Sequence, residues 1–176
     1  MFYKIIDGKS KTYQKLVELN DNEKEIENLN KKLIEEITDG LEWDSFKGYD
    51  RQINLGRVLR VEAFHFTEPD KVDANKWKPL KENSEYYVPN KRTKVGKELA
   101  AKLNQQKQSS VYKVFDILNL DIPNQFRFPQ FFVLDDIIVL YLDERFEIHN
   151  PDVVEITKTE FEQHINDYNQ KQELRK

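Results

Sequence analysis

A stretch of 31 residues with neither proline nor glycine, residues 9–39, is the feature that most constrains how this chain folds. Its apolar residues recur three, four or seven positions apart among Glu, Lys and Asn; they are Leu16, Leu19, Ile26, Leu29, Leu33 and Ile37. This spacing predicts an amphipathic helix of up to ~28 residues, about 42 Å long at 1.5 Å per residue. We expect Gly40 to end the helix.

The weak point of this helix is the polar run from Asn20 to Glu23. Asn20 could cap a second helix, with Glu23 at the third position of a capping box, and the segment would then be a helical hairpin. We favour one helix, because Leu19, Ile26 and Leu33 keep the seven-residue spacing through the polar run. The apolar stripe is thin, so we expect the helix to rest on the body over part of its length and to protrude elsewhere.

The first half of the chain otherwise carries short strand patterns. Residues 2–6 read as a strand ended by Gly8, and residues 57–66 read as a second strand, closed by Pro69. Residues 41–56 hold aromatic side chains without a clear period and predict a loop. Residues 70–92 are charged, and their two prolines favour extended or irregular backbone.

The second half carries clearer signals. Thr93 is the expected cap of a helix, and Val111, Val114, Phe115 and Leu118 have the spacing of a further short helix. Residues 126–142 read as a hairpin that turns at two aspartates, and residues 153–156 read as a strand. Thr157 and Glu160 then form the capping-box pattern of a C-terminal helix.

These elements predict a single α+β domain spanning residues 1–176, with a mainly antiparallel sheet, a long N-terminal helix and a C-terminal helix. The composition agrees, because 12% of the residues are aromatic and can anchor a core although 34% are charged. The chain has no cysteine, which excludes a disulfide framework and thiol chemistry and fits a reducing compartment. It opens without a signal-peptide pattern and holds no apolar run of ~18 residues, so we expect a cytoplasmic protein that makes no membrane contact.

Charge is unevenly distributed along the chain. Residues 1–70 hold 11 basic and 15 acidic side chains, residues 71–113 hold 11 and 4, and residues 114–176 hold 6 and 13. The basic middle can complement acidic parts of the same fold, or it can face an anionic partner such as nucleic acid. We favour internal complementarity, because solvated lysine on exposed faces is the common case.

Familiar catalytic motifs are missing from the sequence. The five glycines never form a phosphate-binding loop, and His65, His149 and His164 lack the spacing of a metal site. The histidines could still meet a carboxylate in space, although unrelated structural or surface roles are the simpler interpretation. We therefore expect no enzymatic activity, no cofactor and no metal.

Two acidic pairs, Asp135 with Asp136 and Asp143 with Glu144, could suggest a magnesium-dependent nuclease. One pair lies at the predicted hairpin turn and the other at the far end of a strand of about six residues. At ~3.3 Å per residue the pairs are ~20 Å apart and cannot share a metal ion. Turn chemistry explains them better.

One segment combines aromatic rings with cations, as nucleic-acid grooves do. Its residues are Trp77, Tyr86, Tyr87, Lys91, Arg92, Lys94 and Lys97, and a second basic group consists of Arg51, Arg57 and Arg60. The alternative is that the rings pin a proline-containing loop to the body while the lysines are solvated, and we favour this alternative.

The same segment resembles a pattern in small uncharacterised proteins of bacteriophages and prophages. In that pattern a Trp and a Tyr-x-Pro precede an Arg-Thr-Lys-x-Gly-Lys helix start; here these are Trp77, Tyr87-Val88-Pro89 and Arg92–Lys97. The resemblance covers residues 77–103, about a seventh of the chain. It implies a phage-encoded accessory protein acting inside a bacterial host, a group in which inhibitors of host defence are common, and it supplies no catalytic residues.

Three functional hypotheses follow. The leading one is a non-enzymatic binding protein that presents charged surfaces and the long helix to a host protein, with the acidic residues 114–176 suited to a basic partner. The second is a nucleic-acid-binding protein that uses residues 77–97. The third is a structural protein that self-associates through the long helix. The sequence leaves the oligomeric state and the partner open.

Overall fold

The computed structural model of the protein describes residues 1–44, 52–55 and 58–176. The fold is α+β, as predicted, and all its strand pairs in the described residues are antiparallel. The chain divides into two compact units: unit 1 is residues 1–22 with 110–176, and unit 2 is residues 23–109. This division differs from the expected single domain, because residues far apart in sequence build unit 1 around a core of its own.

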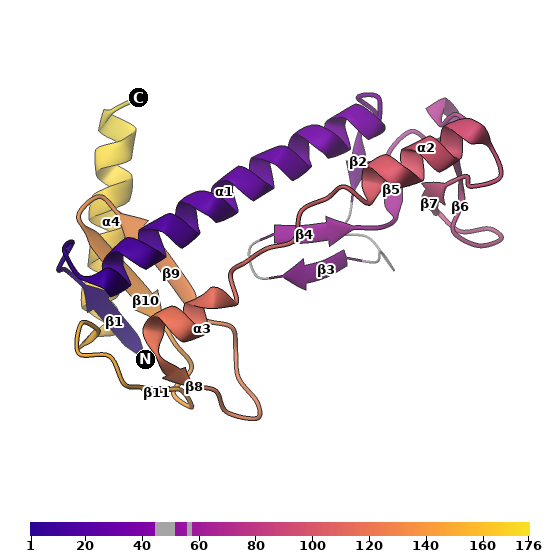
Figure 1. The fold of residues 1–176 in the computed structure, drawn as a ribbon. Helices are drawn as coiled ribbons and strands as arrows, with labels where there is room; N and C mark the ends of the chain where they lie inside the picture. Colours follow the sequence, from indigo (N-terminus) through magenta and orange to yellow (C-terminus); the bar gives the residue numbers. More distant parts are fainter. Residues whose placement is uncertain (45–51, 56–57) are drawn as a thin grey trace. The chain divides into compact units, whose positions relative to one another are not determined.

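The long N-terminal segment is one helix, α1 (Lys11–Ile37), as predicted (Figure 1). Ser10 caps its start, where the Ser10 hydroxyl accepts a hydrogen bond from the Tyr13 N–H at 3.1 Å. Asp39 and Gly40 end it with left-handed backbone, at φ 52° and 74°. The helix packs through Leu16 and Leu19 in the core of unit 1 and through Ile34 and Ile37 in the core of unit 2.

The main sheet of unit 1 has four strands in the order β12 (Val154–Ile156), β1 (Phe2–Ile5), β10 (Ile137–Tyr141) and β9 (Gln130–Leu134). The predicted hairpin is confirmed, with Leu134 opposite Ile137 across the turn. Its first strand begins at Gln130 rather than at residue 126, because Pro129 has no N–H to donate to the ladder. Phe126 and Phe128 pack instead against Phe115.

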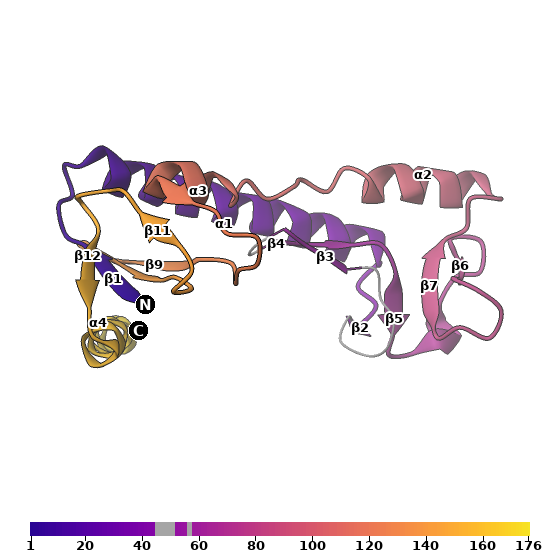
Figure 2. The same ribbon diagram turned by 90° about the horizontal axis from the view of Figure 1, so that it is seen from below.

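Helices cover both faces of this sheet, and the alternation of side chains along β10 decides which residues face which helix (Figure 2). Ile138 and Leu140 belong to the core that also includes residues of α1 and of α3 (Lys113–Leu118). Val139 faces the other way, onto Phe161 of α4 (Lys158–Leu174). Unit 1 is therefore a three-layer arrangement of helix, sheet and helix.

Only the Thr157 half of the capping box predicted for α4 is formed. The Thr157 hydroxyl accepts a hydrogen bond from the Glu160 N–H at 3.1 Å. The Glu160 carboxylate does not complete the capping box within the hydrogen bonds of the described residues; it accepts a hydrogen bond from Lys4 Nζ of β1 at 2.6 Å. The helix is thus joined to the sheet by an ion pair that local sequence does not reveal.

A small two-stranded ribbon lies on unit 1 and was not predicted. It pairs β8 (Leu120–Asp121) with β11 (Glu147–Ile148). Strands of two residues carry too short an alternation for a sequence pattern to show. Leu120 and Ile148 pack against the core of unit 1, which leaves the side chains of Asp121 and Glu147 on the outer face.

The described residues of unit 2 include a second four-stranded sheet, a ribbon, the α-helix α2 and a short 3-10 helix. The sheet order is β2 (Trp43–Asp44), β5 (Phe64–Phe66), β7 (Tyr86–Pro89) and β6 (Trp77–Pro79); the ribbon is β3 (Gln52–Leu55) with β4 (Val58–Val61); the helices are α2 (Lys94–Leu103) and the 3-10 turn η1 (Pro69–Lys71). One prediction was wrong in detail: the strand expected over 57–66 is broken into β4 and β5. The segment 70–92, expected to be extended or irregular, contains the two extended strands of the β6–β7 hairpin.

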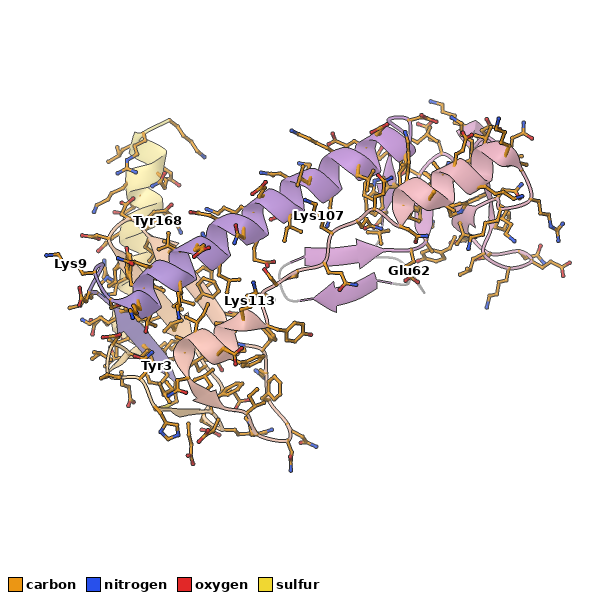
Figure 3. The ribbon with its side chains drawn as sticks, in the orientation of Figure 1. Tyr3, Lys9, Glu62, Lys107, Lys113 and Tyr168 are labelled. Atoms are coloured by element: carbon orange, nitrogen blue, oxygen red, sulfur yellow. The ribbon has the colours of Figure 1, made fainter. Side chains whose placement is uncertain are left out.

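Polar side chains hold the segment that follows α2 against the rest of unit 2. Lys107, which lies in this segment, is labelled in Figure 3. The buried amide of Gln106 accepts from the Val61 N–H at 3.1 Å and donates to the Val61 carbonyl at 2.8 Å. Ser109 donates to the buried carboxylate of Glu23 at 2.5 Å. The middle of α1 is therefore packed through hydrogen bonds where its apolar stripe is thin.

None of the described helices combines the length and the apolar character needed to span a bilayer.

Candidate functional site

The connection between β7 and α2 is the best-defined local structure among the residues predicted to form a site. Asn90 folds it back on itself, because its side-chain oxygen accepts from the Arg92 N–H at 3.2 Å and its side-chain N–H donates to the Ala74 carbonyl at 3.1 Å. Thr93 caps α2 as predicted, accepting from the Gly96 N–H at 2.9 Å, and it donates to the Asn75 carbonyl. This loop and the start of the helix are held rigidly by side-chain hydrogen bonds.

Gly96 allows the loop and the helix to come into contact. A Cβ at this position would lie 1.7 Å from the Asn90 carbonyl oxygen, which is backbone and cannot rotate away. Gly96 is the glycine of the Arg-Thr-Lys-x-Gly-Lys pattern, so close packing explains why a glycine is needed there. In this chain, Arg92–Lys97 therefore form a loop-to-helix junction.

Four cations surround this junction and project into solvent: Lys91, Arg92, Lys94 and Lys97. None of the four makes an ion pair with a residue that the structure describes. Other lysines of the basic segment are paired with the end of α1 and the turn after it, Lys102 with Glu36 and Lys76 with Asp39, each at 2.6 Å. The hydrogen bond from Lys76 to Asp39 raises the pKa of the Lys76 amine.

Internal complementarity thus accounts for part of the basic segment. Unit 2 as a whole holds 17 basic and 16 acidic residues, because α1 contributes its acidic second half to the same unit. The strong positive charge of residues 71–109 is therefore nearly balanced in unit 2, and the positive character that remains is local. It lies at the start of α2.

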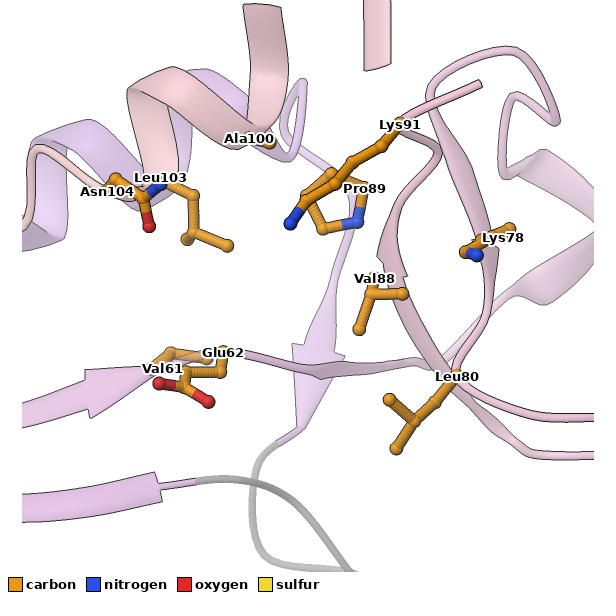
Figure 4. Close-up of a pocket in the computed structure, with 10 residues that line it drawn as sticks. All are labelled: Val61, Glu62, Lys78, Leu80, Val88, Pro89, Lys91, Ala100, Leu103 and Asn104. Atoms are coloured by element: carbon orange, nitrogen blue, oxygen red, sulfur yellow. The ribbon is translucent and has the colours of Figure 1, made fainter. Parts of the chain in front are cut away.

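A pocket of about 370 Å³ opens beside these cations (Figure 4). Its walls come from β4 and the residue after it, from the β6–β7 hairpin and from the last turns of α2; the lining residues are Val61, Glu62, Lys78, Leu80, Val88, Pro89, Lys91, Ala100, Leu103 and Asn104. Figure 4 shows the side chain of Lys91 extending beside Pro89 toward the opening. The walls are mostly aliphatic, and the charged groups are two ammonium groups and one carboxylate.

Two of the three aromatic residues predicted to stack on bases are buried. Trp77 is 2% exposed and packs edge-on against Phe64 and Phe66, at ring distances of 5.2 and 5.1 Å. Tyr86 is 7% exposed, and the half-buried Tyr87 packs on Phe66 at 5.7 Å. The burial of Trp77 and Tyr86 removes these two rings from base stacking, and the ring contacts favour the alternative that the aromatic residues pin the hairpin to the body.

The second basic group cannot be placed with the first. Arg51 and Arg57 lie outside the described residues. The backbone of Arg60 forms part of β4, but the structure does not describe its side chain. The site is therefore built from residues of the first group alone.

The acidic pairs have the turn roles that were expected. Asp135 adopts left-handed backbone, φ 45°, in the turn between β9 and β10. Asp143 accepts hydrogen bonds from the backbone N–H groups of Arg145 and Arg127, each at 3.1 Å, and these bonds lower the pKa of its carboxyl. Both aspartates shape local backbone.

Sequence reasoning missed two features. The aliphatic walls of the pocket come from three separate segments, so no local pattern announces them. A cluster of Asp121, Glu147 and His149 is also assembled across the β8–β11 ribbon. The three histidines are far apart in the sequence, but in the structure each lies near a carboxylate. His65 lies 3.6 Å from Glu85, His149 lies 2.7 Å from Asp121 and His164 lies 3.5 Å from Glu160.

The chain matches no known protein family, no curated protein and no solved structure.

Proposed function

We propose that this protein is a non-enzymatic binding protein that recognises an acidic segment of a partner protein at the pocket of unit 2. The observation that carries the proposal is the juxtaposition of aliphatic walls with unpaired cations. An apolar side chain of the partner would enter between Val88, Leu103 and Leu80. Carboxylates flanking that side chain would meet Lys78 and Lys91 at the rim.

A protein segment suits this surface better than a nucleic acid does. A phosphate backbone would engage the lysines but would leave the aliphatic walls uncovered, and bases could not stack on Trp77 or Tyr86 because both rings are buried. An acidic peptide with one large apolar residue satisfies both halves of the pocket.

The biological setting rests on other grounds than the pocket. The resemblance of residues 77–103 implies a phage accessory protein, so the partner we propose is a bacterial host protein, including one that acts in host defence. The absence of cysteine fits a cytoplasmic interaction. Binding without catalysis is proposed because the pocket offers lysines and one carboxylate and contains no nucleophile paired with a base.

The direct test measures fluorescence anisotropy with two labelled peptides of equal length. One carries a single central Leu among Glu residues, and the other consists of Glu alone. We expect the Leu peptide to bind at least about tenfold more tightly, since the apolar contact adds to the charge term. Equal binding of both peptides, or no binding of either, would contradict the proposed pocket.

Variants connect this test to the pocket. Lys78→Glu with Lys91→Glu reverses the rim charge at two exposed positions and should abolish binding of the Leu peptide. Lys31→Glu with Lys32→Glu makes the same charge change on exposed positions of α1 and is the matched control. Circular dichroism verifies that both double variants are folded.

Binding to nucleic-acid backbone is the second candidate, favoured by the four unpaired cations at the start of α2. It predicts salt-dependent mobility shifts of double-stranded DNA that weaken when Lys91, Arg92 and Lys94 are changed to Ala. Affinity capture from a bacterial lysate with and without nuclease separates the two candidates. A captured protein that survives nuclease and is lost with the rim variant supports the leading proposal, whereas nuclease-sensitive capture supports the second.

A further inference from the structure

The β8–β11 ribbon brings an imidazole and two carboxylates onto one exposed surface of unit 1. Asp121 and Glu147 are directly opposite each other in the antiparallel register, and His149 follows Glu147 by two positions on the same face. The inward packing of Leu120 and Ile148 sets which face these three side chains take. The strand register therefore places Asp121 and Glu147 side by side, and His149 lies one residue beyond β11.

His149, the residue after β11, is paired with Asn119, the residue before β8, through two hydrogen bonds. The His149 N–H donates to the Asn119 carbonyl at 3.3 Å, and the Asn119 side chain donates to the His149 carbonyl at 3.0 Å. Asn119 adopts left-handed backbone, φ 53°, at the end of α3. These contacts place the imidazole beside the two carboxylates before any ligand binds.

The spacing of the potential ligand atoms fits one metal ion. His149 Nε2 lies 2.7 Å from Asp121 Oδ2 and 3.9 Å from Glu147 Oε2, and all three atoms lie within 4.8 Å of one another. Ligands bound tetrahedrally at ~2.0–2.1 Å stand ~3.3 Å apart, which is between the two observed distances. Small side-chain rotations are sufficient to close the site.

The charge at this site also calls for a cation. Like charges directly opposite each other destabilise an antiparallel pair. Among the residues that the structure describes, neither Asp121 nor Glu147 has a lysine or arginine within ion-pair distance, and His149 is the neighbour that both share. A divalent ion would neutralise both carboxylates at once.

We propose that Asp121, Glu147 and His149 bind a Zn²⁺ ion on the β8–β11 ribbon. The imidazole favours zinc over magnesium, because Mg²⁺ prefers oxygen ligands whereas Zn²⁺ accepts nitrogen and oxygen together. Three protein ligands leave one tetrahedral position for water. The ion joins two strands of two residues each, so its role in this proposal is to stabilise the ribbon and the chain segments that lead into it.

Isothermal titration calorimetry with ZnCl₂, in a buffer that does not chelate, tests the proposal on the full chain. We expect one equivalent of Zn²⁺ to bind and MgCl₂ to give no binding under the same conditions. Thermal unfolding should show a higher midpoint with Zn²⁺, because an ion that binds the folded state stabilises it. Failure of the wild-type chain to bind Zn²⁺ at about 1 mM would overturn the proposal.

Three variants locate the ion. His149→Ala and Asp121→Asn each remove one ligand at an exposed position, and each should weaken Zn²⁺ binding by at least about tenfold. His164→Ala removes the histidine that lies 3.5 Å from Glu160, outside the proposed site, and should leave the affinity unchanged. Retention of Zn²⁺ binding in His149→Ala, or its loss in His164→Ala, would show that the ion binds elsewhere and would also overturn the proposal.

Discussion

The side-chain amide of Asn30 pairs with the backbone of Lys107 in both directions, donating to its carbonyl at 2.9 Å and accepting from its N–H at 2.8 Å. Asn30 lies in α1, 77 positions before Lys107, and is 7% exposed. The side chain of Asn30 thus makes the pair of hydrogen bonds with the backbone of Lys107 that a neighbouring strand would make in a sheet. Backbone groups that lose such a partner away from water carry a large cost.

Asn30→Ala should therefore lower the free energy of unfolding by about 1–3 kcal/mol, because it leaves both backbone groups of Lys107 without this partner. Urea denaturation followed by circular dichroism measures the change. Asn28→Ala, at an exposed position of the same helix, is the matched control and corrects for the higher helix propensity of alanine. Equal stability of the two variants would contradict the role assigned to Asn30.

Gly96→Ala tests the contact between the loop and α2. Replacing glycine by alanine inside a helix usually stabilises it by about 1 kcal/mol. Here we expect the opposite sign, a loss of about 1–3 kcal/mol, because the new Cβ would overlap the Asn90 carbonyl oxygen. Gly8→Ala is the control, since the nearest atom to its added Cβ is 3.8 Å away. A stabilised Gly96→Ala protein would show that the junction is looser than described.

Trp77→Ala should act on folding rather than directly on ligand binding. Removing this buried indole leaves a cavity against Phe64 and Phe66, so we expect a loss of about 3–5 kcal/mol in thermal or urea unfolding. Tyr112→Ala, which truncates a ring that is 50% exposed, should cost much less. A Trp77→Ala protein of wild-type stability that had lost affinity for single-stranded DNA would restore the stacking hypothesis.

The ion pair between Lys4 and Glu160 predicts a pH dependence. The hydrogen bond from Lys4 is the largest of the effects that lower the pKa of Glu160 below its ordinary value of 4.5. A carboxyl whose pKa is lower in the folded state contributes stability above the unfolded-state pKa and loses that contribution as the pH falls through the folded-state pKa. This contribution should be complete at neutral pH and disappear on acidification below about pH 4.5.

NMR titration of the Glu160 side chain measures this pKa directly. Lys4→Gln should move it upward, toward the ordinary value, because the main cause of the shift is removed. Lys158→Gln, which removes the looser 3.8 Å pair with Glu162 on the same helix, should leave the Glu160 pKa unchanged. An unshifted Glu160 in the wild-type chain would refute the assignment.

Local sequence signals predicted the elements that local physics controls. The seven-residue spacing through Leu19, Ile26 and Leu33 correctly indicated one long helix, and Thr93 and Thr157 marked the start of two more. The turn at Asp135 marked the main hairpin. In each case the signal and the structure it specifies lie within a few residues, because helix periodicity, capping and tight turns are short-range interactions.

Tertiary structure alone decided which side chains are buried and which meet. The same polar pattern along α1 gives an exposed Asn28 and a buried Asn30, and the same aromatic character gives a buried Trp77 and a half-exposed Tyr112. The pocket and the Asp121–Glu147–His149 cluster join segments that are distant in sequence. Their formation depends on strand register and on packing of complementary surfaces, which no local pattern encodes.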